Sequence, residues 1–223
     1  MGKLFHFLLI EPLVTTLVFL YDYVTFQDLG IAIVLLTFII RLVLFPLFYK
    51  SIRNQAILQK LQPEVEKIQQ LHKHDREKQA TALMELYKNH RVNPLSGFLM
   101  ILVQLPILIA LYQVFLNPPA NLGQLFLNFV DLKKPNLIIV LVAAILQYWQ
   151  GKLSMSATPA SVKDKQENNP AFKIAKNMVI LGPILTVVIL YNLPSAVGLY
   201  WLATTVFSIV QQTYINKTLN PKP

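Results

Sequence analysis

Residues 29–48 read LGIAIVLLTFIIRLVLFPLF and contain one charged side chain, Arg41. A helix of about twenty apolar residues is long enough to cross a hydrocarbon core of roughly 30 Å. Backbone groups inside hydrocarbon must bond within their own segment, so this run predicts a transmembrane helix. The stretch therefore indicates an integral membrane protein.

Four more apolar runs occupy residues 95–116, 136–153, 174–193 and 195–215. Together with residues 29–48 they predict an all-α membrane protein with five transmembrane helices. The composition agrees, because 54% of the 223 residues are hydrophobic and only 14% are charged. A soluble domain carries about 25% charged residues.

The sequence offers little for covalent or metal chemistry. Its lack of cysteine excludes disulfides, thiol nucleophiles and thiolate-held metals. His72 and His74 lie in a charged segment, where we expect a solvated helix face rather than a metal site. No glycine-rich phosphate loop is present, so we predict no cofactor, no metal and no enzymatic activity.

The N-terminal run at residues 4–23 is ambiguous. It is long enough to span a membrane, but Glu11 and Pro12 lie near its middle, and a charge there is costly in hydrocarbon. It could instead lie in the outer interface as an amphipathic helix. A signal-like segment that is not cleaved is a third interpretation.

Residues 50–91 form a charged segment that is long enough for two helices. Apolar residues recur at steps of three and four in each half: Leu58, Leu61, Val65 and Ile68, then Ala80, Leu83, Met84 and Tyr87. Residues 72–75 lie between them as a plausible turn, which predicts a helical hairpin. We expect Pro63 to kink or restart the first helix. The alternative is a plain solvated connector, although long loops without structure are uncommon.

Lysine and arginine are distributed unevenly between the predicted loops. Nine lie within residues 50–91, five within 152–176 and two in the tail, but residues 117–135 hold only Lys133 and Lys134. The positive-inside rule then places the hairpin, the second loop and the C-terminus in the cytoplasm and the N-terminus outside. We attribute the net charge of +9 to this rule rather than to a nucleic-acid partner.

Arg41 is the most informative residue for function. A charge inside a membrane span needs a partner or water, and the other four predicted spans contain no Asp or Glu. The missing carboxylate favours a water-filled groove. The candidate groove residues are Arg41, Thr37, Gln104, Gln147, Gln150, Tyr200, Trp201, Thr204, Thr205, Ser208 and Gln211. Each polar residue alone could equally join helices, and Tyr200 and Trp201 could equally be membrane-interface aromatics.

An ordered series of short motifs resembles the YidC/Oxa/Alb family of insertases along nearly the whole chain. The series comprises Thr37 to Arg41 with Pro46, Leu61-Gln62-Pro63-Glu64, Leu86-Tyr87-Lys88, Val92-Asn93-Pro94-Leu95, Gln104-Leu105-Pro106, Ala110-Leu111-Tyr112, Asp131-Leu132, Gln150-Gly151-Lys152, Leu193-Pro194-Ser195, Leu199-Tyr200-Trp201 and Gln211-Gln212. Each motif alone is weak, but their order and spacing are specific. Thr205 departs from the asparagine often found there, and the short tail after Ile215 weakens the case for ribosome docking.

The resemblance implies five core helices around a hydrophilic groove that is open to the cytoplasm and to lipid. It also implies an outer-surface helix at the N-terminus and a client-recruiting hairpin with Gln62, Pro63, Glu64 and Asp75. The expected division is 1–27 for the interfacial segment, 28–52, 94–116, 136–153, 174–193 and 194–216 for the five spans, 53–93 for the hairpin, 117–135 for the outer connector, 154–173 for the cytoplasmic loop and 217–223 for the tail.

The implied function is that of a membrane protein insertase and chaperone in a bacterial plasma membrane. Its partners would be nascent membrane proteins, the lipid bilayer, the Sec translocon and the ribosome or signal recognition pathway. A small transporter is less consistent with the sequence, because no internal repeat is visible. An intramembrane hydrolase would need a nucleophile with a base, and no histidine lies in the five spans. A passive scaffold remains an alternative.

Overall fold

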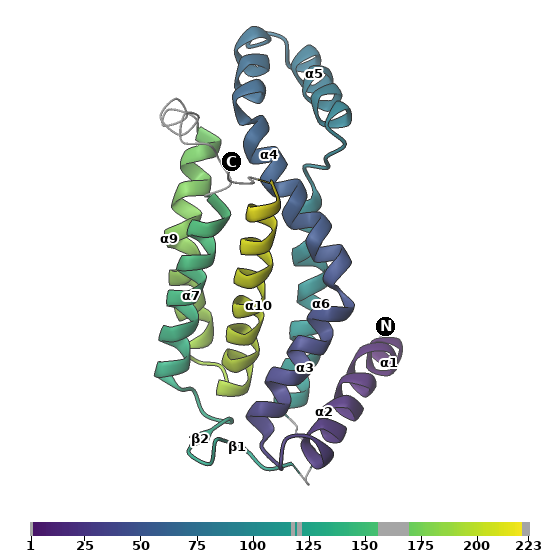
Figure 1. The fold of residues 1–223 in the computed structure, drawn as a ribbon, viewed down its shortest axis with the longest axis vertical. Coiled ribbons are helices and arrows are strands. Elements are labelled where there is room, and N and C mark those ends of the chain that lie inside the picture. The colour runs from purple at the N-terminus through teal and green to yellow at the C-terminus, as the bar shows by residue number, and fades with distance from the viewer. Residues whose placement is uncertain (1, 117–118, 120–121, 156–169, 220–223) are drawn as a thin grey trace.

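The computed structural model describes residues 2–116, 119, 122–155 and 170–219. Long helices form a bundle, with a helical hairpin projecting from one end and a short β-hairpin at the other (Figure 1). The prediction of a helical membrane protein is confirmed, and the two short strands were not expected. Most of the predicted loop at 154–173 and the last residues of the tail lie outside the described residues.

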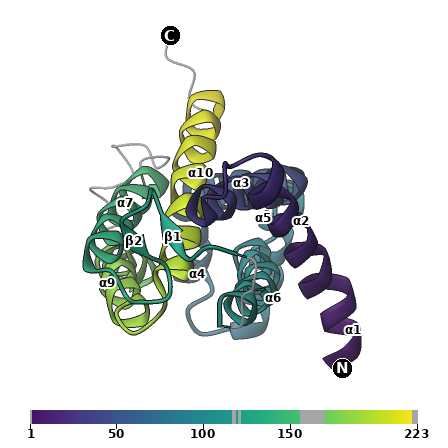
Figure 2. The ribbon, with the colours of Figure 1, turned by 90° about the horizontal axis from the view of Figure 1, so that it is seen from below.

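The N-terminal helix is continuous but irregular. It comprises α1 (Gly2–Phe5), a π-helical turn η1 (His6–Ile10) and α2 (Glu11–Tyr23). Pro12 lacks an amide hydrogen, and helices commonly adjust their hydrogen bonding beside such a residue. Leu17 and Tyr21 are buried against the bundle, whereas α1 extends outward from it (Figure 2).

A sharp bend divides the first predicted span. Helix α3 (Leu29–Val43) begins at Asp28, whose carboxylate accepts a hydrogen bond from the Ile31 amide at 2.9 Å. Helix α4 (Phe45–Leu71) follows at an angle of 69°. Pro46 explains the break, because its ring and missing amide hydrogen disfavour a helix through the preceding turn. The expectation of one helix over residues 29–48 is therefore wrong.

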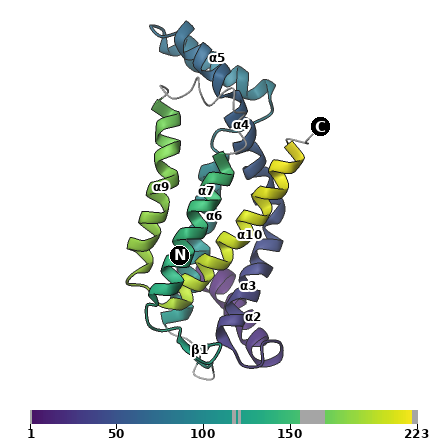
Figure 3. The ribbon, with the colours of Figure 1, turned by 60° about the vertical axis from the view of Figure 1, so that its left-hand side comes forward.

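Helix α4 continues beyond the bundle and pairs with α5 (Arg76–Asn89) as the predicted hairpin, which Figure 3 shows projecting from the end of the molecule. Pro63 was expected to kink or restart the helix; it lies inside α4, so the helix does not restart there, and a kink stays a prediction. Asp75 begins α5 by accepting a hydrogen bond from the Lys78 amide at 3.0 Å.

Small residues let the long helices of the bundle approach closely. Ala32 on α3, Ala110 on α6 (Ser96–Leu116) and Ala143 on α7 (Leu137–Met155) are all fully buried. Such residues are typical of helix contacts in membranes, where close packing replaces the hydrophobic effect. Helix α7 packs against α9 (Pro170–Leu190) and α10 (Ser195–Leu219), and α10 also packs against α3.

The end of the bundle opposite the helical hairpin is closed by β1 (Leu125–Phe126) and β2 (Val130–Asp131), which pair antiparallel. The second carboxylate oxygen of Asp28 accepts a hydrogen bond from the Leu127 amide at 2.6 Å, which fixes the turn to the start of α3. The Tyr21 hydroxyl accepts a second bond, from the Gly123 amide at 2.8 Å. The connector is thus fastened to both neighbouring helices.

The sides of the bundle expose large apolar side chains. Ile138 is 72% exposed and Val188 is 63% exposed, which suits lipid rather than water. By length and composition, Lys3–Tyr23, Ser96–Leu116 and Leu137–Met155 could each cross a membrane, and the bent pair of α3 and α4 would make a fourth span. Neither α9 nor α10 is among these candidates in the described part of the chain, so the two last expected spans stay predictions.

Candidate functional site

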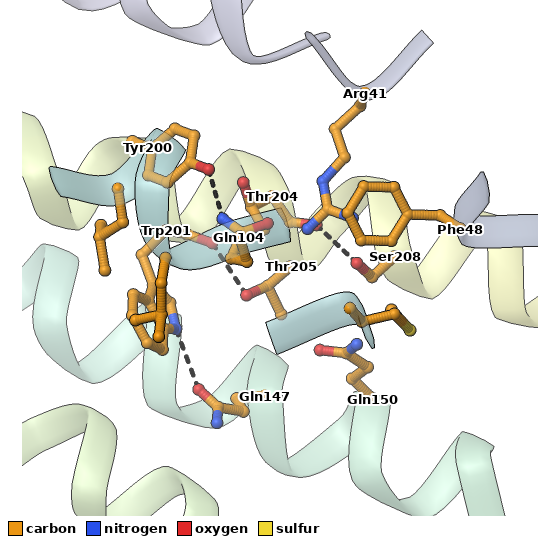
Figure 4. A pocket seen from close by; sticks show the side chains of 13 residues that line it. Arg41, Phe48, Gln104, Gln147, Gln150, Tyr200, Trp201, Thr204, Thr205 and Ser208 are labelled. Carbon is orange, nitrogen blue, oxygen red and sulfur yellow. Dashed lines mark hydrogen bonds between the residues drawn. The ribbon is translucent and has the colours of Figure 1, made fainter. Parts of the chain in front are cut away.

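A pocket of about 300 Å³ lies among α3, α4, α6, α7 and α10 (Figure 4). Its lining residues are Arg41, Phe48, Met100, Gln104, Leu105, Leu108, Gln147, Gln150, Tyr200, Trp201, Thr204, Thr205 and Ser208. Arg41 lies in the last turn of α3, which runs toward the helical hairpin, and Gln104 lies in the first half of α6, which runs away from it. The pocket therefore occupies the half of the bundle nearer the hairpin.

Apolar packing fills the other half of the bundle. Ile33, Leu111 and Val197 belong to one core cluster and are each at most 2% exposed. Leu132, next to β2, is equally buried in the same cluster. The polar pocket thus ends in a dry, close-packed floor on the side of the β-hairpin.

Arg41 is buried, and it has no anionic partner in the part of the chain that the structure describes. The residue is only 5% exposed, and its guanidinium carbon lies 4.4 Å from the centroid of the Phe48 ring. One guanidinium nitrogen, Nη1, has no hydrogen-bond partner among the described residues, and none of the ion pairs found there includes Arg41. A ring face stabilises a nearby cation only in part. The charge therefore remains available to an anionic group or water that enters the pocket.

Side-chain hydrogen bonds hold the pocket wall in place. The Gln104 amide donates to the Tyr200 hydroxyl, which joins α6 to α10. The Gln147 carbonyl oxygen accepts two bonds, one from the Trp201 indole at 3.0 Å and one from the Thr186 hydroxyl. Gln147 thus ties α7 to both α9 and α10 beside the pocket.

The hydroxyl groups of α10 face Arg41 across the pocket (Figure 4). Thr205 donates to the Trp201 carbonyl and Ser208 to the Thr204 carbonyl, both at 2.9 Å. Such bonds use the hydroxyl hydrogen and leave oxygen lone pairs free to accept from a guest or water. The Thr204 hydroxyl oxygen has no partner among the described residues. One face of α10 is therefore polar inside an apolar bundle.

Two of the candidate groove residues do not line the pocket. Thr37 is 1% exposed and donates to the Ile33 carbonyl of its own helix at 2.7 Å. Gln211 is 3% exposed, and its amide lies 3.5 Å from the Phe45 carbonyl, across the junction of α10 and α4. Both side chains satisfy or approach backbone groups at helix contacts, which sequence periodicity cannot distinguish from facing a groove.

The apolar lining residues were not among the candidates. Met100 precedes Gln104 by four residues on α6 and so shares a helical face with a candidate, whereas Phe48 lies beyond the bend, on α4. For Met100, that spacing was the available signal. Leu105 and Leu108 continue the wall along α6. The pocket therefore combines a polar face on α10 with an apolar face on α6.

The hairpin candidates lie far from the pocket. Glu64 is near His90, which directly follows α5, with 3.9 Å between the carboxylate oxygen and the imidazole nitrogen. The Gln62 side-chain oxygen is buried and has no partner among the described residues. The Lys78 amide lowers the pKa of the Asp75 carboxyl by hydrogen bonding to its charged form. Asp75 therefore has a demonstrable role as a helix cap, and a role of these residues in client capture stays a prediction.

The sequence matches the family model described as "60Kd inner membrane protein" over residues 19–222. A protein named "Membrane protein insertase YidC" from Magnetococcus marinus is 40% identical over 98% of this chain and 37% of its own length. A protein of the same name from Fusobacterium nucleatum is 35% identical over 85% of this chain and 87% of its own length. The chain thus spans little more than a third of several long relatives and most of a short one.

A solved structure is also similar. The structure described as "Active YidC insertase crystal structure with the first transmembrane domain resolved" has a TM-score of 0.63 and 28% sequence identity. The likeness covers 90% of this chain and 44% of that one. Both the sequence and the fold lead to the same conclusion: this chain belongs to the 60Kd inner membrane protein family, to which the YidC insertases belong.

Proposed function

We propose that this protein inserts other proteins into the membrane, using the pocket around Arg41 as the site that receives the polar part of a client. The observation that carries the proposal is a buried arginine that forms no ion pair with any described residue and lies among hydroxyl and amide groups in the hairpin-side half of an apolar bundle. The names of the relatives support the same function.

The mechanism follows from the two faces of the site. A polar, often acidic segment of a nascent membrane protein enters from the cytoplasm and is held near Arg41 and the hydroxyl groups of α10. Coulomb attraction is stronger in this low-dielectric site than in water. The apolar segment of the client meanwhile moves into lipid along the exposed apolar sides of the bundle. Burial of apolar area, worth roughly 25 cal/mol per Å², then drives release.

This mechanism needs no covalent step, nucleotide or metal. In this proposal the chain has five core spans, the helical hairpin and the C-terminus are in the cytoplasm, and the β-hairpin is outside. The opposite positions of the two hairpins support this orientation (Figure 1). The N-terminal helix lies in the outer interface in this proposal, and the helical hairpin makes first contact with the client, alone or together with the Sec translocon and the ribosome or signal recognition pathway.

Complementation tests the proposal. Cells depleted of their own insertase receive the native chain, Arg41→Ala or Arg41→Lys, and growth and insertion of a client with an acidic translocated segment are measured. We expect the native chain and the lysine variant to restore both, because each supplies a positive charge. Stable membrane accumulation of the native chain without any rescue would refute the insertase function and favour a scaffold.

A further inference from the structure

A second pocket of about 390 Å³ lies between α4 and the start of α6, and none of its lining residues lines the Arg41 pocket. It is located where α4 leaves the bundle after the bend and where α6 enters it at Ser96. Lys50 on its rim is the first basic residue after the apolar run 29–48. In the proposed membrane orientation, this α4–α6 pocket is level with the lipid headgroups of the cytoplasmic leaflet.

The inner part of the α4–α6 pocket is polar and has unused hydrogen-bonding groups. Asn54 is 9% exposed and makes no side-chain hydrogen bond to any described residue. Ser96 is 6% exposed, and its hydroxyl oxygen also has no partner in the described part of the chain. Buried polar groups of this kind usually have partners. The buried Ser96 hydroxyl is such a group and points to a ligand that supplies its partner, and the Asn54 amide lines the same pocket.

The position of Ser96 adds a preference for anions. Ser96 is the first residue of the 21-residue helix α6, whose positive dipole end thus faces the pocket. The neighbouring Ser51 hydroxyl donates to the Ser96 carbonyl at 2.6 Å, which fixes α4 against this helix end. Lys50 contributes the one charged side chain of the lining, and no carboxylate lines the pocket. The electrostatic field there is positive.

The outer wall of the pocket is apolar. Leu95, Phe98 and Leu102 are between 50% and 66% exposed; Leu95 directly precedes α6, and the other two lie in its first half. A small soluble anion makes no favourable contact with exposed apolar side chains, whereas the acyl chains of a lipid would cover them. The combination of a polar recess, a positive rim and an apolar wall is that of an amphiphilic anion site.

We propose that the α4–α6 pocket binds an anionic phospholipid of the cytoplasmic leaflet. Its phosphate lies between the Lys50 ammonium, the Asn54 amide and the first turn of α6, and an acyl chain runs along Phe98 and Leu102. Bound lipid would brace the junction of α4 and α6 from the side opposite the Arg41 pocket. The inference requires the membrane orientation proposed above but not client insertion.

Photocrosslinking of the full chain in nanodiscs tests this site. Phosphatidylcholine nanodiscs contain a small fraction of phosphatidylglycerol with a photoreactive acyl chain, and peptide mapping compares the yield on residues 93–102 with the yield on α7. We expect Lys50→Gln to lower this ratio about fivefold, the effect of one lysine near an anionic surface. Asn54→Leu should lower it as well without changing the charge of the protein.

The controls separate a built site from general attraction. Arg53→Gln removes the same charge one turn away, outside the pocket lining, and should leave the ratio nearly unchanged. Equal loss in Arg53→Gln and Lys50→Gln would overturn the proposal, and so would equal labelling by photoreactive phosphatidylcholine. Displacement of the probe by soluble glycerol phosphate would overturn the assignment to a lipid. Because Lys50 is exposed, its variant should fold and decides the question if Asn54→Leu does not. The nanodisc assay contains no client protein. Its outcome therefore does not depend on whether the chain acts as an insertase in cells.

Discussion

Replacement of Gln147 by leucine should destabilise the bundle beside the Arg41 pocket. The Gln147 carbonyl oxygen accepts hydrogen bonds from the Thr186 hydroxyl on α9 and from the Trp201 indole on α10. Leucine has a similar size but no acceptor. The substitution therefore removes both bonds and leaves two donors without their partner.

The two donors differ in their access to water. Thr186 is only 1% exposed, so water cannot replace the hydrogen bond that its hydroxyl loses. Leaving such a buried donor without a partner costs about 1–3 kcal/mol of stability. Trp201 lines the pocket, where water can take the place of the Gln147 oxygen. Interhelical bonds in membrane proteins average about 0.6 kcal/mol. We expect Gln147→Leu to lower the free energy of unfolding by about 1–3 kcal/mol in total.

Equilibrium unfolding in mixed micelles measures this loss, and Gln150→Leu is the matched control. Gln150 lies one turn later on α7 and lines the same pocket, but it makes no hydrogen bond to any described residue. Its replacement should change stability by less than about 0.5 kcal/mol. Thr186→Val should also cost less in the Gln147→Leu background than in the native chain, because the two share one bond. Equal effects of the two glutamine variants would refute the reasoning.

Two other perturbations test the fold around the site. A side chain at Gly30 would come within 2.5 Å of the Phe126 Cβ atom, so Gly30→Ala should cost about 1–3 kcal/mol in unfolding free energy, whereas Gly97→Ala, which meets only the flexible end of Gln55, should cost less; equal costs would contradict the packing account. Because the pKa of Asp75 is lowered in the folded hairpin, its stabilisation of α5 should be complete above a pH of about 4 and fade as the pH falls through the lower folded value. Hydrogen exchange of α5 should show this fading in the native chain but not in Asp75→Asn, which keeps a cap without a titrating group; identical pH dependence in both would exclude the cap as the cause.

The sequence predicted the strongest structural features because each rests on a local pattern. Apolar runs indicated a helical membrane protein, and apolar residues at steps of three and four within residues 50–91 indicated the helical hairpin. Arg41 was identified because a charge within a span is costly without a partner or water. Nine of the eleven candidate groove residues line one pocket in the structure, since polar residues in an apolar bundle gather where water can reach.

Other features depend on contacts between distant segments and could not be predicted. The bend at Leu44 lies inside an uninterrupted apolar run, and only Pro46 indicated it. Pro46 lies in the first turn of α4, where a helix needs no amide donor, whereas Pro63, Pro106 and Pro183 lie inside continuous helices, so a proline alone does not tell where a helix ends. The side chains of Thr37 and Gln211 point to backbone carbonyl groups instead of the pocket. The spacing of polar residues in the sequence does not predict this orientation.

Site-specific crosslinking of an arrested client tests most directly whether the charge of Arg41 receives the polar segment. A photoreactive residue at Ser208, across the pocket from Arg41, reports contact with a ribosome-bound client whose translocated segment is acidic. The account predicts strong crosslinking in the native chain and in Arg41→Lys, and a drop of about tenfold in Arg41→Ala, as expected for loss of a charge-assisted contact of roughly 1.4 kcal/mol. A client with a neutral segment should show little difference between the variants. Equal crosslinking of the acidic client in the native chain and in Arg41→Ala would contradict the account.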